Sequence, residues 1–114
     1  MNTENPPSVA FDGLLQKMLR CSRYAKRALE SDPRLMGWLQ ENYATPCDLA
    51  EMLALLQQPG LNLDDEMELA RALRGLRKQV MVKLILRDLN GLCGLDEVVQ
   101  AVTALAEVSI QQAQ

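Results

Sequence analysis

Residues 64–90 read DDEMELARALRGLRKQVMVKLILRDLN, the longest uninterrupted helical pattern in the chain. The stretch contains no proline, and its apolar residues recur at the three- and four-residue spacing of an amphipathic helix. Acidic residues crowd its start, where they complement the positive end of the helix dipole, and Asn62 or Asp64 is a suitable N-cap. Asn90 and Gly91 form a C-terminal stop signal. The stretch predicts a single helix of roughly 40 Å.

Shorter helical patterns precede this stretch. Apolar residues between about residue 8 or 11 and residue 29 follow the helical period and predict one continuous helix. That helix should reach Leu29 and stop at Ser31-Asp32-Pro33, because the residue before a proline is pushed out of the helical region. Asp32 is then the expected N-cap, and Pro33 the first residue, of a second helix that reaches about Asn42.

Two more helix starts complete the pattern. Thr45 is the expected cap of a third helix, with Pro46 in its first turn and Asp48 at the capping-box spacing. Asp96 is the expected cap of the last helix. The sequence therefore predicts an all-α bundle of about five helices, with a flexible lead-in at residues 1–10 and the helical unit at residues 11–114. The last helix reaches residue 114 without a stop signal, so we expect a piece of a longer chain.

Composition excludes several classes of protein. The 114 residues suit one domain, and the absence of histidine excludes triads that use an imidazole base. The three cysteines form no Cys-x-x-Cys pair, which excludes a zinc ribbon or a redox motif of that kind. A net charge of −3 argues against a nucleic-acid partner, and the lack of a long apolar run argues against a membrane-spanning segment. We therefore expect a cytoplasmic protein.

The most interesting polar residues lie in the middle of the long predicted helix. Arg71, Arg74, Arg77 and Lys78 form a basic stripe, with three guanidinium groups on one line. Such a stripe suits ion pairs with a neighbouring helix, plain solvation, a bound nucleotide or a docked domain. We take these four residues as the candidate contact with another domain or partner.

The remaining candidates have structural interpretations. Asp88 opposes the helix dipole near a helix end, so it needs a partner such as Arg74, Arg77 or Lys83. Cys93 is expected to be the most exposed thiol, with no basic neighbour to lower its pKa. We find no candidate catalytic residue, no cofactor-binding residue and no metal ligand, so this segment alone is not expected to be an enzyme.

Residues 73–107 read LRGLRKQVMVKLILRDLNGLCGLDEVVQAVTALAE. This order of motifs resembles the N-terminal helical region of the bacterial bifunctional glutamine synthetase adenylyltransferase/adenylyl-removing enzymes. Lys83 departs from that family, in which arginine is more usual. The matching positions are Leu73, Arg74, Arg77, Arg87, Asp88, Leu89, Gly91, Glu97, Val98, Leu105, Ala106 and Glu107, preceded by Ser22-Arg23-Tyr24 and Asp32-Pro33-Arg34-Leu35.

The resemblance implies a large cytoplasmic enzyme with two nucleotidyltransferase domains. One domain attaches AMP to glutamine synthetase, and the other removes it by phosphorolysis. The implied partners are glutamine synthetase, the PII signalling protein and the rest of the parent chain, and the parent is implied to use Mg²⁺ and ATP. The Gly-rich turn and Asp-x-Asp pair of such domains do not occur in this sequence, so no catalytic or metal-binding residue is assigned to it.

Two functions remain open at this point. In the first, the chain is a non-catalytic helical part of such an enzyme, ends before the adenylyl-removing domain and braces that domain. In the second, it is a free-standing helical adaptor or regulator, whose six methionines suit an adaptable binding face. Exposed apolar surface would also favour a dimer in a crystal.

Overall fold

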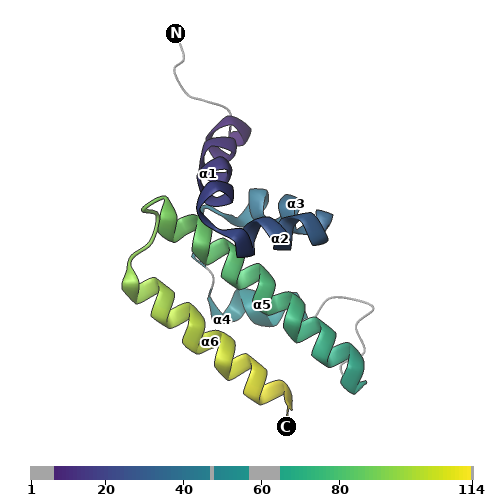
Figure 1. Ribbon diagram of the computed structural model, residues 1–114. Coiled ribbons are helices and arrows are strands. Elements are labelled where there is room, and N and C mark those ends of the chain that lie inside the picture. The colour runs from purple at the N-terminus through teal and green to yellow at the C-terminus, as the bar shows by residue number, and fades with distance from the viewer. Residues whose placement is uncertain (1–6, 47, 57–64, 114) are drawn as a thin grey trace.

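The computed structural model describes residues 7–46, 48–56 and 65–113, and they form an all-α structure (Figure 1). The predicted fold class is therefore confirmed, and within these residues there is one helix more than the expected five. Residues 1–6 of the expected lead-in lie outside the described residues, while residues 7–10 are helical. The helices are α1 (Pro7–Cys21), α2 (Arg23–Ser31), α3 (Pro33–Asn42), α4 (Leu49–Leu56), α5 (Glu66–Leu89) and α6 (Leu95–Ala113).

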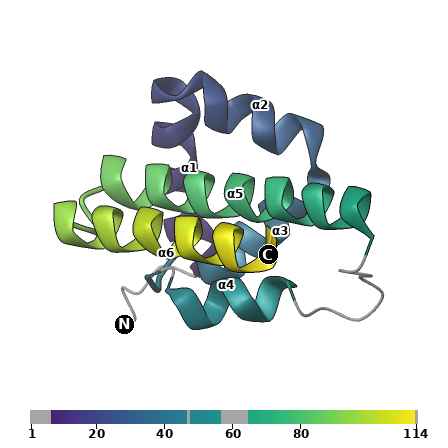
Figure 2. The same ribbon diagram turned by 90° about the horizontal axis from the view of Figure 1, so that it is seen from below.

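The long helix α5 is the centre of the fold. It packs against each of the other five helices, which are arranged around it (Figure 1). Helix α6 runs back alongside α5, and Figure 2 shows α2 on one side of this pair and α4 on the other. The predicted long helix is thus confirmed, and its 24 residues correspond to a length of roughly 36 Å.

Helix α5 contributes to two separate hydrophobic clusters. Its Val82 and Leu86 belong to a cluster with α1, α2 and α3, whose other members are Phe11, Leu15, Met18, Ala25, Ala28, Leu29, Leu35 and Leu39. Its Leu76, Val80 and Leu84 belong to a cluster with α4 and α6, whose other members are Met52, Leu56, Ala101, Leu105 and Val108. One helix therefore joins two cores.

The predicted continuous first helix is wrong, because the chain breaks at Ser22. Ser22 has extended backbone angles (φ −133°, ψ 111°), and its Oγ accepts a hydrogen bond from the Ala25 N–H at 3.1 Å. It is therefore the N-cap of α2. The apolar period runs on across the break, since Met18 and Ala25 are both fully buried, so hydrophobic spacing could not reveal it.

Three of the predicted N-caps are also corrected. Helix α4 is capped by Asp48, whose Oδ1 accepts from the Glu51 N–H at 2.9 Å, rather than by Thr45. Helix α5 is capped by Asp65, whereas Asn62 and Asp64 lie outside the described residues. Asp96 does not cap α6, because it lies in the first turn of that helix.

Two predicted helix boundaries are confirmed. Asp32 caps α3 by accepting from the Arg34 N–H at 3.2 Å, and Pro33 is the first residue of that helix. At the end of α5, Leu92 N–H donates to the Arg87 carbonyl at 2.7 Å and Gly91 N–H donates to the Asp88 carbonyl at 3.2 Å. Gly91 has a φ of +70°, so this end is a Schellman motif.

Candidate functional site

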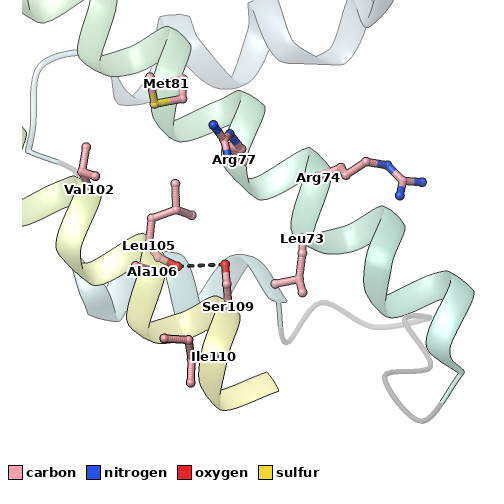
Figure 3. Close-up of a pocket in the computed structure, with 9 residues that line it drawn as sticks. All are labelled: Leu73, Arg74, Arg77, Met81, Val102, Leu105, Ala106, Ser109 and Ile110. Atoms are coloured by element: carbon pink, nitrogen blue, oxygen red, sulfur yellow. Dashed lines mark hydrogen bonds between the residues drawn. The ribbon is translucent and has the colours of Figure 1, made fainter. Parts of the chain in front are cut away.

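A groove of about 570 Å³ lies between α5 and α6 (Figure 3). Its walls are mostly apolar, and both helices contribute to them. Ser109 adds no free donor, because its Oγ–H donates to the Leu105 carbonyl one turn earlier, at 2.9 Å. The lining residues are Leu73, Arg74, Arg77 and Met81 from α5, and Val102, Leu105, Ala106, Ser109 and Ile110 from α6.

The structure separates the four residues of the predicted basic stripe. Arg74 and Arg77 line the groove beside α6. Lys78 lines a different depression, which it shares with Arg23 and Arg27 of α2. Arg71 is exposed and lines neither of these hollows. Among the described residues, none of the four forms an ion pair or hydrogen bond, so only Arg74 and Arg77 can act together on a ligand in the groove.

Two other cations of α5 are buried and form ion pairs. The Lys83 side chain is completely buried, and its Nζ lies 3.1 and 3.3 Å from the two carboxylate oxygens of Glu51 on α4. The same Nζ donates to Thr45 Oγ1 at 3.4 Å and lies 5.7 Å from the centroid of the Trp38 ring on α3. Lys83 therefore ties α3, the following loop and α4 to the central helix. A lysine can form these contacts in place of the arginine that is more usual in the family, because its ammonium group acts as a compact charge with several hydrogen-bond donors.

Arg87 forms four hydrogen bonds, one more than Lys83 does. Its Nε and Nη2 donate to the two carboxylate oxygens of Glu97 on α6 at 2.6 and 2.9 Å. Nη1 donates to the Tyr43 carbonyl at 2.9 Å, and Nη2 also donates to the Leu92 carbonyl at 3.1 Å. The fork shape of a guanidinium group suits this bidentate contact. The charged hydrogen bond to Arg87 lowers the pKa of Glu97, and the same bond raises the pKa of Arg87.

Neither buried cation was predicted, although a signal was present in the sequence. Lys83 and Arg87 are one turn apart, and they share the inward face of α5 with Val80 and Leu84. A cation on the apolar face of a central helix indicates a buried partner. Their partners lie far along the chain or across a loop, so the identity of those partners could not be read from local spacing.

The expectations for Asp88 and Cys93 need correction. Asp88 is exposed, and Lys83, one of its expected partners, is bonded to Glu51 instead. Cys93 is half-buried while Cys21 is exposed, so Cys93 is not the most exposed thiol. Burial raises the pKa of Cys93, with Glu97 acting in the same direction. Arg87 acts in the opposite direction, so a basic neighbour does exist. Cys47 lies outside the described residues.

The described part of the chain contains neither a metal-binding cluster nor a helix that could span a membrane. Within it, no three side chains of cysteine, aspartate or glutamate come together where they would hold a metal ion. None of the helices described there is both long enough and apolar enough to cross a membrane.

Comparison with known proteins assigns the family. The family model for glutamate-ammonia ligase adenylyltransferase matches residues 13–114. No solved structure matches the chain.

Individual relatives agree with the family model, and each is called a bifunctional glutamine synthetase adenylyltransferase/adenylyl-removing enzyme. The protein of Nitrosomonas europaea is 44% identical over 98 residues, which are 86% of this chain and 10% of the relative. That of Aromatoleum aromaticum is 35% identical over 115 aligned positions, which cover 97% of this chain and 12% of the relative. That of Thioalkalivibrio sulfidiphilus is 37% identical over 110 aligned positions, which cover 92% of this chain and 11% of the relative. The chain thus spans about a tenth of the length of these relatives, and it belongs to the glutamate-ammonia ligase adenylyltransferase family.

Proposed function

We propose that this chain is the N-terminal helical part of an enzyme that adenylylates and deadenylylates glutamine synthetase. In this role it braces the adenylyl-removing domain and does not catalyse either reaction itself. The observation that carries the proposal is the family match over residues 13–114, together with relatives that are about ten times longer. The ion pairs of Lys83 and Arg87 support a bracing role, because they lock three segments onto one long helix.

The partners follow from the same proposal. The names of the relatives identify glutamine synthetase as the protein on which they act. We propose that the parent enzyme also responds to PII protein, works in the cytoplasm and uses Mg²⁺ and ATP. We assign the binding of Mg²⁺ and ATP to residues outside this chain.

The first experiment is to read the gene beyond the codon for Gln114. The proposal predicts that the frame continues into a strand, a Gly-rich turn and an Asp-x-Asp pair. A stop codon directly after Gln114 would contradict it. That result would favour the adaptor, whose binding face would be the apolar residues of α6 that are exposed in the structure, Leu95 at 77% and Ile110 at 59%.

The second experiment tests the bracing role in the full-length enzyme. Replacing Arg74 and Arg77 by glutamate reverses the charge beside the groove, and it should lower both the thermal stability and the rate of deadenylylation of glutamine synthetase. The matched control is the pair Lys17→Glu and Arg20→Glu on α1, which has the same spacing, exposure and change in charge. Equal effects of the two double variants, or no effect of the first, would contradict the bracing role at this surface.

A further inference from the structure

Helix α6 carries two apolar stripes, and only one of them is buried in the part of the chain that the structure describes. The inner stripe contains Ala101, Leu105 and Val108, which are at most 8% exposed. The outer stripe contains Leu95, Val99, Val102, Ala106 and Ile110, which recur at spacings of four, three, four and four residues. The four larger side chains of the outer stripe are between 46% and 77% exposed.

The spacing of the outer stripe is that of a helix that packs against another helix. Single exposed apolar residues are normal on a protein surface, whereas a periodic row of them indicates an interaction site. Val102, Ala106 and Ile110 of this row also line the groove between α5 and α6. The row and the groove are therefore one continuous surface, which can accept an elongated apolar partner along α6.

The two flanks of this surface have opposite charge. On the side of α5 it is bordered by Arg74 and Arg77, which have no ion pair or hydrogen bond among the described residues. On the other side lie the exposed Asp96, Thr103 and Glu107, which share one face of α6 by their spacing of seven and four residues. A partner with the matching pattern would gain apolar burial in the middle and ion pairs on both sides.

We propose that this surface binds an amphipathic helix with a row of apolar residues, carboxylates on the flank that faces Arg74 and Arg77, and basic residues on the other flank. The inference rests on the proposed function in one respect, namely that this helix belongs to the remainder of the parent polypeptide. The surface includes Arg74 and Arg77 but excludes Arg71 and Lys78. Only half of the basic stripe therefore contributes to docking.

The test uses the 114-residue chain and two synthetic helical peptides, with affinity measured by fluorescence anisotropy. Both peptides carry leucines at three- and four-residue spacing and lysines on one flank. The other flank carries glutamates in the first peptide and lysines in the second. The chain has a net charge of −3, so non-specific attraction favours the all-lysine peptide. Tighter binding of the glutamate peptide would therefore be specific, and replacing Arg74 and Arg77 by glutamate should reverse the preference.

The apolar row is tested by Val102→Asp, with Thr103→Asp as the matched control. Valine and threonine have the same shape, and both positions are exposed on α6, but only Val102 lies in the outer stripe. Val102→Asp should lower the affinity for the glutamate peptide at least about tenfold, which is a loss of roughly 1.4 kcal/mol in binding free energy. Thr103→Asp should leave this affinity unchanged or improve it. Ile110→Asp is the second variant if Val102→Asp does not fold.

Three results would overturn the proposal: equal binding of both peptides, no binding of either, or equal effects of the two aspartate variants. A dimer that is dissociated by Val102→Asp, detected by sedimentation, would also overturn it by making a second copy the occupant. None of these measurements depends on what the gene encodes after Gln114. A failure of the docking surface is therefore distinguishable from a failure of the proposed function.

Discussion

Arg87 is a residue on which three segments of the chain converge. It bonds to Glu97 on α6 and to the carbonyls of Tyr43 and Leu92. Replacing Arg87 by methionine removes four hydrogen bonds, two to the Glu97 carboxylate and one to each carbonyl. We expect a fall of about 3 kcal/mol in the free energy of unfolding, measured by urea denaturation at neutral pH.

The matched control for this experiment is Arg71→Met. Arg71 lies on the same helix, but it is exposed and has no hydrogen-bond partner among the described residues. Its replacement should change the free energy of unfolding by less than about 0.5 kcal/mol. Equal losses for the two variants would mean that the bonds of Arg87 contribute no more than an exposed arginine does.

Glu97 provides a pH-dependent contribution from the same ion pair. Its hydrogen bond with Arg87 lowers its pKa in the folded state below the ordinary value of 4.5. A lowered pKa means that the folded state binds this proton less readily than the unfolded state does. The stabilisation is therefore fully present above pH 4.5 and is lost as the pH falls through the lower, folded value.

The measurement is the urea midpoint of the parent chain and of Glu97→Gln between neutral pH and about pH 3. We expect the difference between the two urea midpoints to be largest near neutral pH and to shrink on acidification. The reason is that the parent loses its ion pair, while the glutamine does not titrate. A gap that stays constant over this range would exclude Glu97 as the source of the acid sensitivity.

At the scale of the element, the boundary between α1 and α2 depends on one hydroxyl group. Ser22 Oγ accepts from the Ala25 N–H. Ala25 and Ala28 of α2 are buried in the hydrophobic cluster that α5 forms with α1, α2 and α3. Ser22→Ala should therefore lower the free energy of unfolding by about 1 kcal/mol. Ser22→Asn should lower it much less, because asparagine is also a good N-cap. Thermal unfolding of the three proteins is the measurement. Asparagine as destabilising as alanine would contradict the capping role.

The elements that sequence could predict are those with a local chemical signal. Asp32 before Pro33, and Asn90 before Gly91, act through backbone groups a few residues away, and the structure confirms both boundaries. Ser22 also acts locally, but the apolar period continues across it and pointed to an unbroken helix. The groove between α5 and α6 could not be predicted, because it depends on which face of each helix the other one covers. The buried position of Lys83 depends in the same way on Glu51, 32 residues away.

At the scale of the whole molecule, two cores share one helix, so they should unfold together. Met52 lies in the core with α4 and α6, and Leu39 lies in the core with α1, α2 and α3. Both side chains are fully buried, so replacing either by alanine should lower the free energy of unfolding by about 3 kcal/mol. Trp38, the only tryptophan, packs against the core that contains Leu39 and therefore reports on that half of the molecule.

The decisive comparison is the midpoint of Trp38 fluorescence in Met52→Ala. Because α5 contributes side chains to both cores, and Lys83 links Glu51 of α4 to the Trp38 ring, this remote change should shift the Trp38 midpoint as much as Leu39→Ala does. The control is Met67→Ala, which removes a methionine that is 73% exposed and should leave the midpoint in place. If Met52→Ala instead produced a separate early transition that Trp38 did not detect, the two cores would be independent units. In that case, docking of a domain on α6 would not affect the stability of the helices on the other side of α5.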